Sequence, residues 1–375
     1  MSFGTVAREA KAAMADEVSN HLDRRGFLRR ACAATAVAGS APVLVAEEKP
    51  APQPARARGE EARLTGIVYD ELYKKHLTGQ WHPEKPARCD AIMAALSAKP
   101  LAEMLKRIRP RPAEEAELLA CHTKQYVQTV RDDVKAGRLS LSTGDTTLCK
   151  DSMTAAMLAA GGVMAAVDAV VAGEVKNAFC VVRPPGHHAG PGKGMGFCIF
   201  NNIAVAARYA QKKHRLAKVL IADWDVHHGN GTQDIFYEDP SVLFFSTHQS
   251  PWYPGTGRAE ETGAGKGKGT TLNCPFPAGS GRKQVLGAFT EKLAPAADKF
   301  EPDIVMISAG FDSRAGDPLG RFTLTDDDFA DLTKLCLAIA RRHAAGRVVS
   351  VVEGGYDLNG LAAASAAHVK ALTGA

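Results

Sequence analysis

Two carboxylates and an imidazole follow one short apolar run at every second residue. The run 218–222 leads directly into DWDVHHGNG, residues 223–231. If the chain stays extended there, Asp223, Asp225 and His227 face the same way, because side chains alternate along a strand. The competing interpretation makes the aspartates turn caps and the histidines packed core residues. Three such side chains on one strand end favour a metal site over that interpretation.

A third metal ligand is available at a second strand end. The segment IVMISAGFDSRAGDP places Asp312 just after a glycine, where close backbone approach is allowed. Asp225, His227 and Asp312 would leave an open coordination position, which is typical of catalytic rather than structural zinc. The alternative for Asp312 is a loop carboxylate that pairs with Arg314, a structural role for which Asp317 is the better candidate.

Two further strand ends offer groups for proton transfer and charge stabilisation. His187 and His188 follow a Pro-Pro-Gly turn, and a neutral imidazole can take a proton from water and return it to a leaving amine. Tyr356 in VVEGGYDL could donate a hydrogen bond to an oxyanion, a contribution of about 3 kcal/mol in comparable sites. Each feature alone is more often packing or chance, but the Gly-rich loop after the histidines suits the wall of a narrow channel.

The elements that would position these residues alternate along the chain from Thr65 onward. Short apolar runs and Ala-rich helical stretches predict an α/β fold, with a parallel sheet covered by helices on both faces. The predicted strands are 66–69, 178–182, 218–222, 242–246, 304–308 and 347–352. The predicted helices are 85–96, 154–172, 201–214, 283–300, 326–344 and 359–372. Ligands of such sheets bind outside the carboxyl ends of the strands, where the candidate residues lie.

Composition indicates a globular chain and excludes some partners. With 375 residues and 45% hydrophobic content, the chain can bury a large core. A formal net charge of +5 is too weak to suggest nucleic acid. No apolar stretch is expected to reach the roughly 18 to 20 residues of a membrane-spanning helix, so we expect no membrane partner. The eight cysteines are scattered singly, which favours buried free thiols over disulfides or a thiolate metal site.

The first 63 residues predict an export signal and a linker. The segment DRRGFLR resembles the twin-arginine export motif, although Asp23 stands where Ser or Thr is commoner, and a small, uncharged Ala-rich stretch follows. We therefore expect a signal over 1–46, a Pro- and charge-rich linker over 47–63 and a catalytic domain over 64–375. The expected partner is the twin-arginine translocon and the expected location is the periplasm. If 1–46 is only a disordered basic segment, the location is cytoplasmic.

From about Thr65 to Ala375 the chain resembles the zinc-dependent histone deacetylase superfamily, which includes the acetylpolyamine amidohydrolases. HGNGTQ and EGGY are closer to class II and bacterial deacetylase-like amidohydrolases than to class I. The resemblance implies an arginase-like three-layer fold with an eight-stranded parallel sheet and the active site at the strand carboxyl ends. The similar segments, in family order, are HPEKPARCDAI, LLACHTKQYV, RPPGHHA, GFCIFNN, DWDVHHGNGTQDIFY, YPGTG, SAGFDSRAGDPLG and VVEGGYDL.

The resemblance also implies roles for single residues. The zinc ligands fall on Asp225, His227 and Asp312, the active-site histidines on His187 and His188, and the transition-state tyrosine on Tyr356. A structural potassium ion is implied near Asp223, Asp225, His227 and Ser246, with Asp223 also holding one histidine. The substrate positions fall on Asp145, which would bind the substrate's amide at the rim of the channel, and on Gly196 and Phe197, which would line the channel wall.

One position departs from class I. Asn230 stands where class I has an aspartate beside the second histidine. An amide orients an imidazole without adding the negative charge that stabilises its protonated form. We therefore expect His188 to be less basic than a carboxylate-paired histidine.

Together these features predict a zinc-dependent hydrolase that removes acetyl or other acyl groups from amines such as acetyl-lysine or acetylpolyamines. His188, with His187 beside it, would activate the water, and Tyr356 would stabilise the oxyanion. One alternative is a binuclear manganese arginase-like amidinohydrolase, which needs more bridging carboxylates than DWDVHHGN supplies. Another is a catalytically silent acyl-amine binding protein. The resemblance allows an oligomer, and the sequence leaves the natural acyl-amine open.

Overall fold

Eight parallel strands form one sheet in the order β2-β1-β3-β8-β7-β4-β5-β6. The computed structural model describes residues 64–374, so the predicted signal and linker lie outside the described residues. The strand number and the parallel arrangement confirm the predicted α/β class. The strands are β1 (Thr65–Val68), β2 (Leu105–Ile108), β3 (Asn177–Cys180), β4 (Val219–Asp223), β5 (Val242–Gln249), β6 (Thr271–Phe276), β7 (Ile304–Ala309) and β8 (Val348–Val352).

The six inner strands correspond to the six apolar runs of the sequence. Every residue of these strands is buried, as expected when helices cover both faces of a parallel sheet. The two edge strands, β2 and β6, were not predicted from the apolar runs. Their sequences, LKRI and TLNCPF, are partly exposed, because an edge strand tolerates charge and proline that an inner strand does not.

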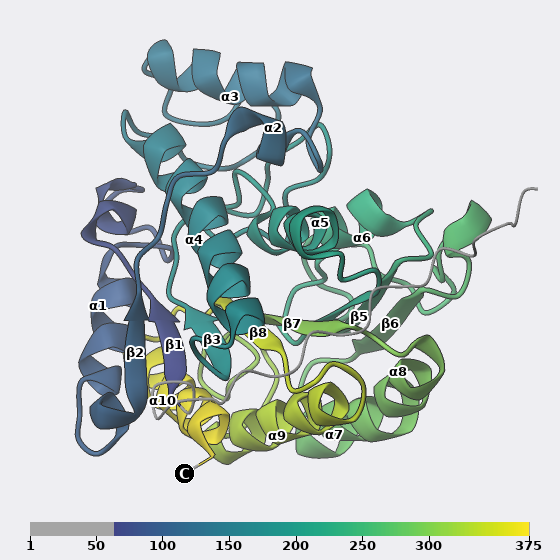
Figure 1. Ribbon diagram of the computed structural model, residues 1–375. Coiled ribbons are helices and arrows are strands. Elements are labelled where there is room, and N and C mark those ends of the chain that lie inside the picture. Colours follow the sequence, from purple (N-terminus) through teal and green to yellow (C-terminus); the bar gives the residue numbers. More distant parts are fainter. Residues whose placement is uncertain (1–63, 375) are drawn as a thin grey trace, which may run out of the picture. The chain divides into compact units, whose positions relative to one another are not determined.

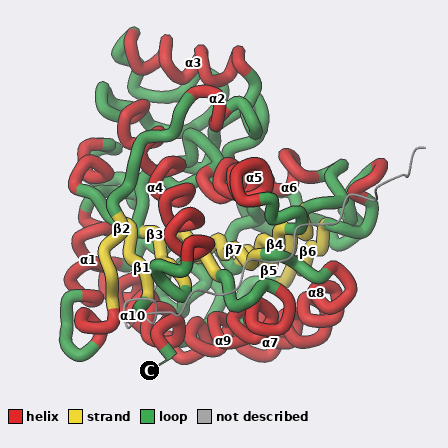
Figure 2. The backbone as a smooth tube through the Cα atoms, viewed as in Figure 1, coloured by secondary structure: helices red, strands yellow, loops and turns green. Residues whose placement is uncertain are grey.

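Two layers of helices cover the sheet (Figures 1 and 2). One layer contains α4 (Ser152–Ala172), α5 (Asn202–His214) and α6 (Asn230–Phe236), with the short α2 (Glu115–Leu118) and α3 (Lys124–Lys135) beyond it. The other contains α1 (Ala87–Leu96), α7 (Arg282–Ala288), α8 (Ala294–Phe300), α9 (Asp326–His343) and α10 (Leu358–Thr373). A π-helical turn, Phe289–Leu293, joins α7 to α8, so the predicted helix 283–300 is three consecutive helical pieces.

Helix α4 corrects one expectation from the sequence. It has 21 residues and is apolar enough to cross a membrane by length and composition, although no such stretch was expected. Yet 72% of its most apolar window is buried, where the helix packs against α5, β1 and β3. A Cβ on Gly161 would lie 1.8 Å from the backbone oxygen of Arg111, so the helix is closely packed there. The apolar surface of α4 is therefore explained by the core.

The described cysteines are all free thiols. Six of the seven are buried, and Cys149 is partly exposed. Burial raises the pKa of Cys180, on β3, above its ordinary range. These thiols therefore act as small apolar core residues.

Candidate functional site

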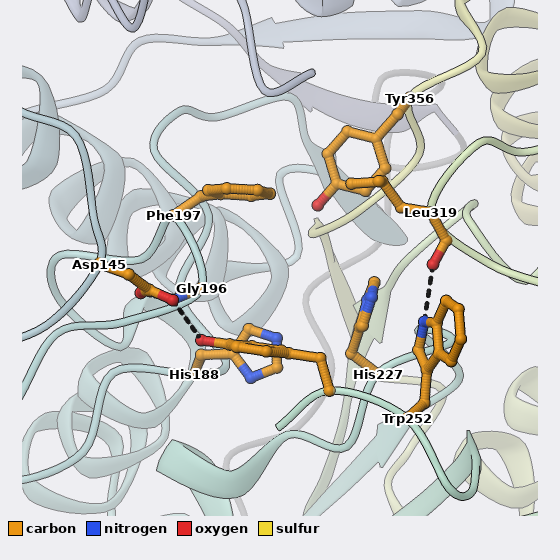
Figure 3. A pocket seen from close by; sticks show the side chains of 9 residues that line it. Asp145, His188, Gly196, Phe197, His227, Trp252, Leu319 and Tyr356 are labelled. Atoms are coloured by element: carbon orange, nitrogen blue, oxygen red, sulfur yellow. Dashed lines mark hydrogen bonds between the residues drawn. The ribbon is translucent and has the colours of Figure 1, made fainter. Parts of the chain in front are cut away.

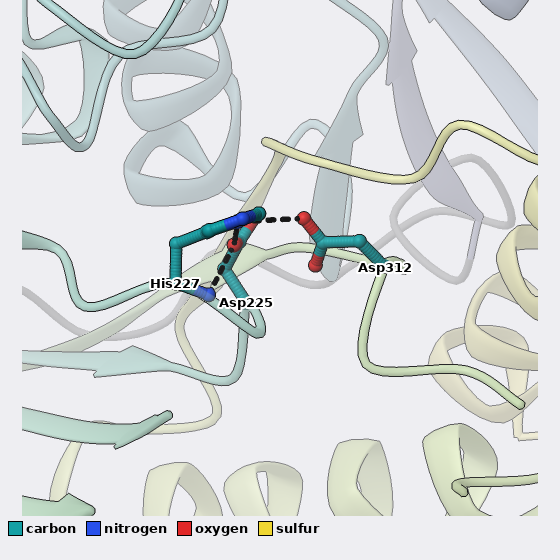
Figure 4. Close-up of side chains that lie close together, drawn as sticks. All are labelled: Asp225, His227 and Asp312. Carbon is teal, nitrogen blue, oxygen red and sulfur yellow. Dashed lines mark hydrogen bonds and ion pairs between the residues drawn. The ribbon is translucent and has the colours of Figure 1, made fainter. Parts of the chain in front are cut away.

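Two neighbouring strand ends bring three metal-binding side chains together. Asp225 and His227 follow β4, and Asp312 follows β7, which pairs with β4 in the sheet. One ligand atom from each residue lies within 4.8 Å of the others, and all three residues are buried. Nδ1 of His227 is 3.0 Å from Oδ1 of Asp225 and 3.1 Å from Oδ2 of Asp312 (Figure 4). The structure thus groups the three residues that the sequence singled out.

The backbone route to this cluster differs from the predicted extended strand. β4 ends at Asp223, and the chain then bends. The N–H of Asp225 donates to Oδ1 of Asp223 at 3.0 Å, and the N–H of His227 donates to Oδ1 of Asp225 at 2.8 Å. Each aspartate therefore accepts a bond from the residue two positions on, which stabilises a turn. The alternate side chains still reach one site, but through two successive turns.

The cluster fits a divalent cation. Burial, followed by the charge of Asp225, raises the pKa of Asp312 to about 7, because a carboxylate without water is costly to ionise and a second negative charge nearby repels it. Gly354 leaves no room for a side chain beside them: a Cβ there would lie 2.0 Å from Oδ2 of Asp312 and 2.6 Å from Oδ2 of Asp225. Two carboxylates and one imidazole are donors that zinc accepts, and a bound cation would neutralise their repulsion.

The two histidines of the loop after β3 lie beside this cluster with different partners. Nδ1 of His187 is 3.0 Å from Oδ2 of Asp223, and Nδ1 of His188 is 2.7 Å from Oδ1 of Asn230. Burial, followed by His187 and His227, holds the pKa of His188 well below its ordinary value. For His187, burial lowers the pKa, but Asp223 outweighs it and raises the pKa to about 10. The pairing of Asn230 with His188 follows the sequence prediction.

A cavity of about 310 Å³ opens above the cluster. The hydroxyl of Tyr356 points into it (Figure 3). A Cβ on Gly196 would lie 2.3 Å from Cδ2 of His188, so only glycine allows the loop to pass this close. The lining residues are Asp145, His188, Gly196, Phe197, His227, Trp252, Tyr253, Leu319 and Tyr356.

The predicted rim residue, Asp145, lies at the exposed mouth of this cavity. Its Oδ1 accepts from the N–H of Gly196 at 2.7 Å, and its Oδ2 accepts from the hydroxyl of Tyr253 at 3.1 Å. Both carboxylate oxygens are therefore hydrogen-bonded to the chain itself.

Asp223 and Ser246, two of the residues implied for a potassium ion, lie side by side. They are directly paired across β4 and β5, and both are fully buried. The hydroxyl of Ser246 is 2.9 Å from Nδ1 of His248.

The sequence prediction missed several residues that hold the site in place. Arg88 donates to the carbonyl of Gly355 at 2.7 Å and lies 5.1 Å from the ring centre of Tyr356. Asp317, for which the sequence suggested a structural pairing with Arg314, instead accepts from the N–H of Tyr356 at 2.7 Å, and Arg314 pairs with Asp326. The peptide group that precedes Tyr356 is thus held from two sides, and the only sequence signal for Arg88 was that it falls inside one of the quoted segments.

Glu353 was also missed, although it directly precedes the Gly-Gly-Tyr turn. Its Oε2 accepts from the N–H of Gly186 at 2.7 Å and from that of His187 at 3.2 Å. Burial raises the pKa of Glu353 to about 7. This carboxyl group therefore joins the end of β8 to the histidine loop.

Comparisons with known proteins agree on one family. A model of the histone deacetylase domain matches residues 82–372. A probable deacetylase of Archaeoglobus fulgidus is 40% identical over 299 residues, covering 79% of this chain and 82% of the relative. The chloroplastic histone deacetylase 14 of Arabidopsis thaliana is 40% identical over 309 residues, with coverages of 78% and 73%. The crystal structure of the HDA15 HD domain matches with a TM-score of 0.78 and 39% identity, over 83% of this chain and 90% of that one.

Proposed function

The chain belongs to the histone deacetylase family, with its arginase-like fold, and on this basis we propose that it is a zinc-dependent deacetylase of acylated amines. Membership of this family supports a hydrolytic deacetylation reaction, and zinc is the metal on which the family generally depends. The proposed substrates are acetyl-lysine or acetylpolyamines. The observation that carries the proposal is the meeting of Asp225, His227 and Asp312 beside a cavity that also presents His188 and Tyr356.

Asp225, His227 and Asp312 would hold the ion. Nδ1 of His227 is the nitrogen that faces both carboxylates. Zinc bound there would polarise an amide carbonyl and lower the pKa of a water molecule. Among residues 64–374, this is the one group of three or more such side chains that could hold a metal. That supports one ion per chain and weighs against a binuclear manganese centre.

His188 would act as the base. Asn230 accepts from Nδ1 of His188, which leaves Nε2 free to accept a proton from the attacking water. Its pKa lies below the ordinary value, so the ring is neutral near pH 7. The same imidazole system would return the proton to the leaving amine, with His187 held beside it by Asp223 at a ring separation of 4.0 Å.

Tyr356 would stabilise the oxyanion. Burial, followed by the charge of Asp312, raises the pKa of its phenol well above 10, so the hydroxyl stays protonated and can donate. Arg88 and Asp317 hold the peptide group before Tyr356 through its carbonyl and its N–H, and Asp317 also accepts from the N–H of Asp357. A preorganised donor costs no reorganisation when the charge develops, which is why it is effective.

Turnover by the zinc-loaded full chain tests this function. The substrates to be compared are an acetyl-lysine peptide, an acetylpolyamine and analogues with longer acyl groups. Tyr356→Phe should lower kcat by about 100- to 1,000-fold, and His188→Ala by at least about 100-fold. Tyr209→Phe and His214→Ala serve as matched controls because both side chains pair with the partly buried Asp168 and neither lines the cavity. Both variants should stay within about twofold of wild-type kcat.

The two alternatives give different results in the same experiment. Binding of acyl-amines with no turnover by the one-zinc protein would indicate a silent binding protein. Activity that requires two manganese ions per chain would indicate an arginase-like enzyme. Export by the twin-arginine route, a periplasmic location and the potassium ion stay predictions from the sequence.

A further inference from the structure

Three residues form a hydrogen-bonded group across the mouth of the cavity, and Figure 3 labels two of them, Asp145 and Gly196. Asp145 accepts from the backbone of Gly196 through one oxygen and from the phenol of Tyr253 through the other, at 2.7 and 3.1 Å. Gly196 and Tyr253 belong to loops that are 57 positions apart in the sequence and line the same cavity. Asp145 therefore hydrogen-bonds to both of these walls at the mouth of the cavity.

The ring of Tyr253 covers the reactive side chains. Its edge-to-face contacts place it 5.3 Å from the ring centre of His188 and 6.1 Å from that of His227, with interplanar angles of 88° and 81°. The neighbouring wall is independently fixed, because Phe197 packs against His82 at 4.6 Å. Tyr253 is 37% exposed, so packing alone does not hold its ring, and its hydroxyl is the part that is tied down.

A phenylalanine at position 253 would supply the same apolar wall but nothing for Asp145 to accept from. The hydroxyl is the donor of this bond, because a carboxylate oxygen can only accept, and the two oxygens lie 3.1 Å apart. The hydroxyl therefore has a specific partner.

We propose that Asp145 is a positioning residue that ties Tyr253 to the Gly196–Phe197 wall and so fixes the width of the substrate channel. This inference rests on the proposed deacetylase function. It adds to the role that the resemblance implied, in which Asp145 hydrogen-bonds to the amide of the substrate. If Asp145 acts mainly by holding Tyr253, the KM for a substrate without any backbone amide depends on Asp145 as much as the KM for a peptide does.

The test compares Asp145→Asn, Tyr253→Phe and the double variant on two substrates. One is an acetyl-lysine peptide, and the other is an acetylated straight-chain alkylamine with no backbone amide. Asparagine keeps an oxygen for the N–H of Gly196, but its Nδ2 cannot accept from Tyr253 and can only donate to the phenol oxygen, so the charged acceptor of that hydrogen bond is lost. Each single variant should raise KM by about three- to tenfold on both substrates, with kcat within about twofold, and the double variant should be no worse than either single.

The Asp168 and Tyr209 pair provides the matched control. The phenol of Tyr209, in α5, donates to Oδ2 of Asp168, in α4, at 2.9 Å, and the pair is partly buried. Asp168→Asn and Tyr209→Phe should leave both KM values unchanged. Two results overturn the proposal. One is that Asp145→Asn raises KM for the peptide substrate alone while Tyr253→Phe changes neither KM. The other is that the effects of the two single variants on KM add in the double variant.

A stability measurement tests the hydrogen bond between Asp145 and Tyr253 independently of the proposed function. In the metal-free full chain, the Tm losses of Asp145→Asn and Tyr253→Phe should be less than additive in the double variant. If the wild type turns over none of the substrates, the deacetylase proposal fails. The comparison of Tm losses still shows whether Asp145 and Tyr253 are coupled. Additive Tm losses would show that Asp145 and Tyr253 act independently.

Discussion

At the scale of single residues, the absence of a side chain at position 354 matters as much as the ligands. The N–H of Gly354 donates to Oδ2 of Asp225 at 2.8 Å, and a Cβ would collide with both carboxylates of the cluster. We expect Gly354→Ala to weaken zinc binding by about 10- to 100-fold, because it moves the ligands apart. Competition against a chromophoric chelator measures this.

The control for that variant is Gly287→Ala. A Cβ at Gly287, in α7, has open space around it, and alanine in a helix costs less than glycine. Zinc affinity should be unchanged and the fold slightly more stable. Equal zinc affinity in Gly354→Ala and the wild type would contradict the packing described around the cluster.

The residues that sequence could predict are those whose chemistry is visible locally. Asp225 and His227 share one short segment after a strand, so their types and spacing indicated a metal site, and Asp312 followed from a second strand end. Arg88 could not be predicted in the same way, because its partner, the carbonyl of Gly355, is 267 positions away. Tyr253 was missed because a wall residue has no spacing rule, and only the fold brings its ring to His188.

At the scale of elements, one buried carboxylate joins three segments. Oε1 of Glu84, just before α1, accepts from Nη1 of Arg88 at 3.1 Å, and Oε2 accepts from Nη2 of Arg183 at 2.6 Å. Arg183 precedes the histidine loop, and Arg88 holds the turn that carries Tyr356. The entry to α1 thus supports both sides of the site.

Glu84→Gln should therefore destabilise the fold by about 3 to 5 kcal/mol, because it leaves buried arginine charge without its partner. Burial raises the pKa of Glu84, but Arg183 and then Arg88 outweigh it and lower the pKa to about 2. Since this folded pKa lies below the ordinary 4.5, the stabilisation is present above about pH 4.5 and is lost as the pH falls towards 2. Urea unfolding at pH 7 and at acidic pH measures both effects.

A surface ion pair provides the control for Glu84. Glu103 and Lys99 are 2.8 Å apart, with most of both side chains exposed, and Glu103→Gln should cost less than about 1 kcal/mol. Similar urea midpoints for the two variants at pH 7 would show that the Glu84 network does not support the fold.

Element prediction succeeded where burial is complete. The inner strands β4 and β7 read as continuous apolar runs because both faces of the sheet are covered. The edge strands β2 and β6 carry lysine, arginine or proline, and their pairing is decided by the neighbouring strand rather than by their own composition. Helix α3 was missed for a related reason: it is mostly polar and buries only one face, led by Tyr126 and Val130.

At the scale of the whole molecule, the sheet converts distant segments into one site. The carboxyl ends of β3, β4, β7 and β8 lie along one edge and deliver the histidine loop, the metal cluster and the Tyr356 turn. The metal ligands therefore exist as a group only in the folded chain. Any ion that binds them stabilises the fold by mass action.

Chelation should consequently lower Tm. An ion at about 100 times its Kd adds about 2.7 kcal/mol to the free energy of unfolding, which corresponds to roughly 5 °C in Tm for a domain of this size.

Metal-free protein should also lose stability as the pH rises from about 4 to 7, because the pKa of Asp312 is raised to about 7 and its ionisation beside Asp225 is unfavourable. Asp312→Asn removes that repulsion, so in chelator at pH 7 it should melt no lower than the wild type, and added zinc should not raise its Tm. If zinc stabilises Asp312→Asn as much as the wild type, the ion is held elsewhere and these three residues are not its ligands.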